Sequence, residues 1–280
     1  MPMTINTNII SLNAQRNLNG SQSSLATSMQ RLSSGLRVNS AKDDAAGLAI
    51  AERMNAQVRG MNVAIRNAND GISLGQTADG ALSSIGDSLQ RMRELAVQSR
   101  NSTNSDSDKD SLDLEFKQLA GEINRVLGGT TFNGKFILGA DAGTLTFQVG
   151  ANVTANDSID IATSDMTVDP KITTVTGATI GSAANATALA TVITDIDAAL
   201  DDINSQRAVF GASQNRFSAV ITNLQTSVEN QSAARSRIMD ADFAAETASM
   251  SRAQILQQAG TAMVAQANQL PQNVLRLLQG

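Results

Sequence analysis

Apolar residues recur at every seventh position near both ends of this 280-residue chain. The N-terminal stripe consists of Leu18, Leu25 and Leu32, with Met29 and Leu36 beside it. The C-terminal stripe consists of Leu256, Met263, Leu270 and Leu277, with Val274 beside it. Such spacing is typical of helices that pair along an apolar seam. We therefore predict two terminal helices that use these residues to contact each other or neighbouring copies of the chain, with a kink at Pro271.

A longer seven-residue repeat lies further inside the chain. It consists of Leu189, Ile196, Ile203, Phe210, Phe217 and Leu224. This repeat predicts a long helix, and residues 82–96 and 112–126 carry shorter helical patterns. Residues 144–149 and 158–161 alternate between apolar and polar, which predicts short strands. Helices from both ends can share a bundle only if the chain reverses. We therefore predict a mainly α fold, a long antiparallel helical bundle or coiled coil folded back on itself, with a small β-hairpin region in the middle of the chain.

The composition argues against catalysis. The chain contains no histidine and no cysteine. Catalysis by Ser-His or Cys-His pairs is therefore excluded, and zinc and copper lose their usual ligands. We predict that the protein is not an enzyme and that it has no catalytic residues, no metal and no cofactor.

The charge pattern and the hydropathy restrict the partners. Acidic residues concentrate in 101–205, whereas 1–40 and 249–280 carry only basic charges. Nucleic-acid binding would need a dense basic patch, which is missing. No run approaches the roughly 18 apolar residues of a membrane span, and the first residues lack the apolar core of a secretory signal. We expect neither nucleic-acid binding nor membrane insertion.

Two short motifs imitate ligand sites. The segment GTTFNGK at 129–135 matches the start of a phosphate-binding loop, but Phe136 stands where magnesium binding needs a hydroxyl. The segment DSDKD at 106–110 resembles the start of a calcium loop, but Ser111 replaces the required glycine and Lys117 the glutamate. We predict a turn leading into a strand at the first segment and a solvated connection or helix start at the second.

Four long segments closely resemble bacterial flagellin. They are INTNIISLNAQRNL (5–18), LSSGLRVNSAKDDAAGLAIAERM (32–54), LQRMRELAVQSRNSTN (89–104) and SRAQILQQAGTAMVAQANQLPQNVLRLL (251–278). The resemblance implies a subunit that polymerises into the helical flagellar filament and serves swimming motility. It also implies three parts, which are a coiled-coil domain of the inner tube (1–40 with 240–280), a helical bundle with a β-hairpin in the outer tube (41–165 with 188–239) and a short variable exposed loop (166–187).

The same resemblance implies the partners and the location. The expected partners are other copies of the chain, cap and hook-associated proteins, and an export chaperone that binds the C-terminal helix. The expected location is extracellular, in the filament. A vertebrate Toll-like receptor senses flagellin, and the matching positions here are Gln90, Arg91, Leu95, Gln98 and Glu115. Because ordering an isolated helix costs conformational entropy, we expect the terminal helices to order on assembly.

Two other classes of protein share parts of the pattern. A type III secretion translocator would also have terminal helices, but it should contain an apolar membrane-inserting segment. A secretion needle subunit should be far shorter. An enzyme would need a group of chemically active residues brought together, and the only segment that suggests one is 129–135.

Overall fold

The computed structural model describes the backbone of residues 7–278 and the side-chain surroundings of residues 7–269. The described chain is mainly helical, which confirms the predicted fold class. Its helices are α1 (Ile9–Ser34), α2 (Ala45–Ser99), α3 (Asp106–Gly129), α4 (Pro170–Thr176), α5 (Ala186–Met239) and α6 (Phe243–Leu278). Its strands are β1 (Thr131–Phe132), β2 (Lys135–Phe136), β3 (Thr144–Gln148) and β4 (Ser158–Ala162).

The chain divides into two compact units. The terminal unit contains Met1–Ala56 and Asn230–Gly280, and the central unit contains Gln57–Glu229. Helices α2 and α5 each contribute residues to both units. The assignment of the units to an inner and an outer tube stays a prediction.

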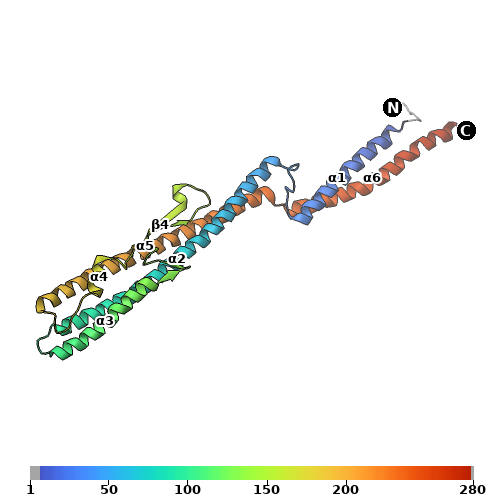
Figure 1. Ribbon diagram of the computed structural model, residues 1–280. Helices are drawn as coiled ribbons and strands as arrows, with labels where there is room; N and C mark the ends of the chain where they lie inside the picture. The colour runs from blue at the N-terminus through green and yellow to red at the C-terminus, as the bar shows by residue number, and fades with distance from the viewer. Residues whose placement is uncertain (1–6, 279–280) are drawn as a thin grey trace. The chain divides into compact units, whose positions relative to one another are not determined.

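In the terminal unit, α1 and α6 lie side by side and antiparallel (Figure 1). Ser11 contacts Asn268 near one end of the pair, and Arg31 contacts Glu246 near the other. The α6 backbone stays helical through Pro271, so this residue does not end the helix. We predicted that Pro271 kinks the helix without ending it. The continuous helix is confirmed, and the kink stays a prediction.

A short backbone pairing follows the end of α1. Gly35 adopts a left-handed conformation with φ of 72°, which glycine reaches without a Cβ clash, and its N–H donates to the Arg31 carbonyl. The next residues then pair with the segment before α6, where the Ala241 N–H donates to the Gly35 carbonyl at 2.9 Å. Val38, Ala51 and Met239 form a small apolar core beside this pairing. Leu36, one of the predicted interface residues, packs against that core.

The core of the central unit confirms the long inner repeat. Ile196, Ile203, Phe210 and Phe217 of α5 are all buried, and so are Leu82, Ile85, Leu89 and Met92 of α2. Two polar residues of α5, Arg207 and Gln214, also contact α2. The Arg207 guanidinium donates from Nε to Asp79 Oδ1 at 2.7 Å, and a Cβ at Gly75 would lie 3.2 Å from the Gln214 side chain.

The segment that resembles a calcium loop is the start of α3. Ser105 and Asp108 form a capping box, in which each side chain accepts the backbone N–H of the other. The hydrogen bonds from the Ser105 hydroxyl and backbone N–H lower the pKa of Asp108. Asp110 accepts the Ser182 backbone N–H at 2.8 Å. These carboxylates therefore stabilise backbone groups, as the prediction of a helix start requires.

The segment that resembles a phosphate-binding loop is a β-hairpin. Strands β1 and β2 pair in the register Thr131↔Phe136 and Phe132↔Lys135. The two turn residues both have positive φ, 50° at Asn133 and 79° at Gly134, which suits the right-handed twist of a two-residue hairpin. The backbone turns back into a strand here, where a phosphate site would continue into a helix.

Strands β3 and β4 form a second antiparallel pair, which confirms the strands predicted at 144–149 and 158–161. The pair packs on both long helices of the central unit. The Phe147 ring meets Phe217 of α5 edge to face, with centroids 5.4 Å apart. On the other side, Asn67 of α2 donates from Nδ2 to the Gln148 carbonyl at 2.9 Å.

The segment 166–187 differs from the exposed loop that we expected. It contains α4, which has Asp169 as N-cap and Pro170 in its first turn. Ile172, Val175 and Ile180 are buried in the central core. An Asp-Pro pair followed by apolar residues three apart is a helix-start signal, and the high Thr, Ala and Gly content of the segment obscured it.

Candidate functional site

The inner face of the terminal helix pair is built from leucines on one side and small residues on the other. Leu18, Leu25 and Leu32 of α1 share one face and are half-buried. On α6, Gly260 lies opposite Leu18, and a Cβ added there would come within 3.2 Å of Leu18 Cδ1. Ala253 is also buried on α6. Small residues let the two helices approach closely, so the α1 stripe is covered by the small-residue face of α6.

The described part of the C-terminal stripe is largely exposed. Leu256 is 51% exposed and Met263 is 64% exposed. The α1 residue Met29 is 55% exposed. Leu270, Val274 and Leu277 lie outside the residues whose side chains are described. The sequence left open whether the stripes contact each other or neighbouring copies, and in this chain the described part of the C-terminal stripe is uncovered.

Sequence reasoning missed further exposed apolar residues on the same two helices. They are Ile9, Ile10, Leu12, Phe243 and Ile255, each at least half exposed. These residues fall outside the seven-residue spacing, so a search for stripes passes over them. The sequence feature that could have identified them is the number of large apolar residues at positions where a helix of a stable monomer would carry polar ones.

Polar contacts between α1 and α6 set the register of the helix pair. The Asn8 side chain caps α1 by accepting the Ser11 N–H and donates from Nδ2 to the Ala267 carbonyl at 2.8 Å. Ser11, itself 5% exposed, donates from Oγ to Asn268 Oδ1 at 2.7 Å. A shift by one helical turn would separate these partners and leave the buried Ser11 hydroxyl without Asn268, which is how a polar layer selects one register.

A second candidate site lies on α2 and α3 in the central unit. The Arg91 guanidinium donates to Glu115 of α3 at 2.8 Å and to Glu94 at 2.9 Å. The hydrogen bonds with Glu94, and then with Glu115, raise the pKa of Arg91. Gln90 and Gln98 are exposed on the same helix. This network gives Arg91 a defined place on an open, charged surface.

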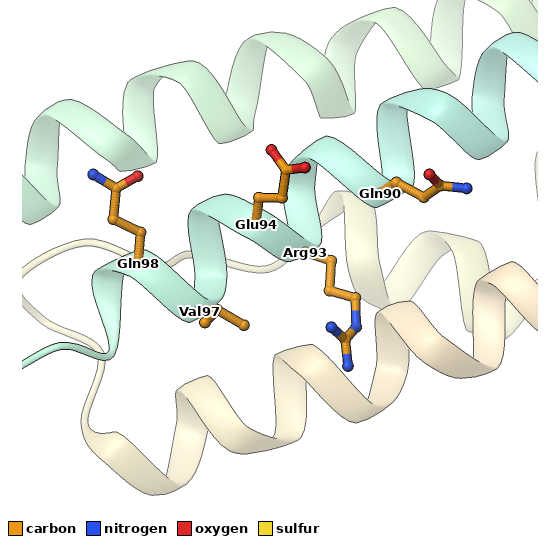
Figure 2. A pocket seen from close by; sticks show the side chains of 5 residues that line it. All are labelled: Gln90, Arg93, Glu94, Val97 and Gln98. Atoms are coloured by element: carbon orange, nitrogen blue, oxygen red, sulfur yellow. The ribbon is translucent and has the colours of Figure 1, made fainter.

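A surface pocket of about 490 Å³ lies along the same stretch of α2 and is lined by Gln90, Arg93, Glu94, Val97 and Gln98 (Figure 2). Arg93 points toward α5, where its Nε donates to Asp197 Oδ1 at 2.7 Å. Leu95, the remaining predicted recognition residue on α2, is 0% exposed and belongs to the central core. Leu95 can therefore influence this surface only through the packing beneath it.

Comparison with known proteins decides the family. The family model of the bacterial flagellin N-terminal helical region matches residues 5–146. The family model of the bacterial flagellin C-terminal helical region matches residues 193–278. The chain belongs to the bacterial flagellin family. A flagellin of Halalkalibacterium halodurans is 46% identical to this flagellin over 277 residues, which cover 99% of this chain and 100% of the relative.

A second relative agrees with that membership, and a solved structure is also similar to part of the chain. The flagellin of Bacillus subtilis is 42% identical over 306 residues, covering 99% of this flagellin and 100% of the relative. The crystal structure of Bacillus cereus flagellin is 34% identical, with a TM-score of 0.49, and covers 61% of this chain and 94% of that chain.

The family makes this flagellin a structural subunit of the flagellar filament, which serves motility and is built by self-polymerisation. Flagellins are a family of structural proteins and not a family of enzymes. Among the described residues, no helix has the length and hydropathy to cross a membrane. In the same residues, no group of three or more acidic side chains is placed to hold a metal ion.

Proposed function

We propose that the exposed apolar residues of α1 and α6 are the contacts through which copies of this flagellin polymerise. The observation that carries the proposal is the exposure of Met29, Leu256 and Met263 on helices whose inner face is already closed. Full burial of a leucine or methionine side chain stabilises by about 1.5–3 kcal/mol. Several such residues on each helix give every subunit a strong tendency to cover this surface with another copy.

The same exposure supports ordering on assembly. Helices α1 and α6 pack against each other, and among the described residues each covers only part of the other's apolar surface. The remaining stabilisation comes from neighbouring copies, so folding of α1 and α6 and addition to the polymer become one event. Contacts that repeat head to tail without closing into a ring give an open helical polymer, and in this proposal α1 and α6 form the coiled coil of its inner tube.

The proposal includes the partners that handle the subunit before and after export. Exposed Ile255, Leu256 and Met263 make α6 prone to nonspecific association in a free subunit. We propose that an export chaperone covers α6 until secretion, and that cap and hook-associated proteins present matching helical surfaces at the ends of the extracellular filament.

The substitution Met263→Asp tests the assembly surface. We expect the variant to remain helical and to require at least a tenfold higher protein concentration to polymerise. The reason is that one lost apolar contact of about 1.5 kcal/mol is already close to tenfold, and a carboxylate buried in an apolar contact adds to that loss. Sedimentation of polymer against soluble protein measures the critical concentration.

The matched control is Val153→Asp. Val153 is 100% exposed in the loop between β3 and β4, so this change introduces the same charge away from the terminal helices. Val153→Asp should polymerise like the unmodified protein. Equal critical concentrations for Met263→Asp and Val153→Asp would show that Met263 is not at a subunit contact.

We also propose that the surface around Arg91 is recognised by a Toll-like receptor. Its support is that Gln90, Arg91, Gln98 and Glu115 are all exposed and that the Arg91–Glu115 ion pair joins α2 to α3. Recognition would use these exposed groups, and Leu95 would hold the α2 surface in shape from the core.

The substitution Arg91→Ala tests receptor recognition. Removing a charge-assisted contact of about 1.5–3 kcal/mol should lower the potency of the monomer in a receptor reporter assay by tenfold or more. Lys109→Ala on α3 is a control that removes a positive charge elsewhere on the same unit. Unchanged potency of the Arg91→Ala monomer, with normal folding by circular dichroism, would refute the receptor proposal.

A further inference from the structure

The described methionines range from buried (Met61, Met92, Met166 and Met239) through half-buried (Met54 and Met250) to exposed (Met29 and Met263). Met92 is 0% and Met166 1% exposed, and both belong to the central core. Met29 is 55% and Met263 64% exposed, and both lie on the terminal helix pair. Reagents in solution can therefore reach the sulfur atoms of Met29 and Met263, whereas the packed core covers those of Met92 and Met166.

Both exposed methionines lie among the leucines of the terminal patterns. Met263 continues the stripe that starts at Leu256, seven residues earlier, and Met29 lies between Leu25 and Leu32 on α1. Methionine and leucine have similar volume and apolar character, so either would serve a purely apolar contact. Unlike leucine, the thioether can be oxidised reversibly.

The chemistry needs a peroxide as oxidant. The thioether sulfur attacks one oxygen of hydrogen peroxide, an S–O bond forms, and the O–O bond breaks. The sulfur is oxidised by two electrons to the sulfoxide, and the peroxide is reduced to water. The product is a polar, chiral side chain, and methionine sulfoxide reductases can return it to the thioether.

We propose that Met29 and Met263 are peroxide-sensitive modification sites that control whether a free subunit can join the polymer. The inference rests on the proposed assembly surface, because only a covered methionine would make oxidation matter. A sulfoxide buried in an apolar contact loses its hydrogen bonds to water without replacement, which opposes assembly. Once the subunit is in the polymer, the neighbouring copy covers both sulfur atoms and protects them.

The experiment treats the purified full-length monomer with hydrogen peroxide and then removes the peroxide with catalase. Peptide mass mapping reports which methionines have gained oxygen, and sedimentation reports the critical concentration for polymerisation. We expect Met29 and Met263 to be oxidised, Met92 and Met166 to stay reduced, and the critical concentration to rise at least tenfold. Treatment with methionine sulfoxide reductases should restore assembly.

The decisive variant carries Met29→Leu and Met263→Leu together. It should polymerise like the unmodified protein and keep that ability after peroxide. Met166→Leu is the matched control, which should stay as sensitive to peroxide as the unmodified protein. Loss of assembly by the oxidised double variant would overturn the proposal, because the effect would then come from other methionines, including Met1 and Met3. Normal assembly of protein with both sulfoxides would also overturn it.

A failure of the oxidation proposal can be distinguished from a failure of the proposed assembly surface. If Met263→Asp polymerises normally, the assembly surface is wrong, whatever peroxide does. If Met263→Asp blocks polymerisation and the doubly oxidised protein still assembles, only the oxidation proposal fails. Peroxide treatment of finished polymer gives the second arm, in which oxidation of Met29 and Met263 at the monomer rate would contradict protection by neighbouring copies.

Discussion

Deletion of residues 256–280 should give a soluble monomer that does not polymerise at any accessible concentration. The deletion removes Leu256 and Met263 together with Asn268 and the Ala267 carbonyl, the α6 groups that hydrogen-bond near the start of α1. It leaves the central unit whole, because the large apolar core lies entirely within Gln57–Glu229. We therefore expect the loss of assembly to be complete and the loss of folding to be local.

Three measurements check this outcome. Electron microscopy under polymerising conditions should show no filaments, and sedimentation should give a monomer. Circular dichroism should show a loss of helix no larger than the deleted residues and α1 together, with the unfolding transition of the central unit unchanged. Filaments of normal form from the truncated chain would remove α6 from the assembly mechanism and leave the exposed stripe without a role.

The helical elements could be predicted from spacing because burial on one face of a helix imposes a period on the sequence. The repeat through Ile196, Ile203 and Phe210 is buried in the central core. The same reasoning could not show which face of α6 meets α1. Ala253 and Gly260 line that face, and small residues give little hydropathy signal although they decide how closely two helices approach.

Polar contacts between distant segments could not be predicted from the sequence either. The hydrogen bond between Ser11 and Asn268 joins residues that are 257 positions apart in the sequence. Nothing in the sequence around Ser11 distinguishes it from a solvent-exposed serine. The packing of Ile180 into the core depends on Asp113, which accepts the Ile180 N–H at 2.8 Å. A run of small and polar residues looks exposed until the side chain that satisfies its backbone is known.

Phe217→Ala should destabilise the central unit by about 3–5 kcal/mol, the usual result of removing a buried aromatic ring. Phe217 is fully buried, meets the Phe147 ring edge to face, and fills the space beside Gly71, so it joins α5, α2 and the β3–β4 pair. Because a domain is stable by only about 5–15 kcal/mol, this loss is a large fraction of the total. Urea unfolding followed by circular dichroism measures it, and Val209→Ala on the exposed side of α5 is the control.

Substitution of Gly71 tests whether the Phe217 ring fills the space beside this glycine. A Cβ at this position would lie 2.7 Å from the Phe217 ring, so Gly71→Ala forces the ring to move and should destabilise the unmodified protein. In the Phe217→Ala background the ring is gone, and the added methyl group should stabilise, because alanine favours a helix interior over glycine by roughly 1 kcal/mol. A double-mutant cycle should therefore give a coupling energy that reverses the sign of the Gly71→Ala effect. Independent, additive effects of the two substitutions would mean that the ring does not occupy the space that Gly71 leaves open.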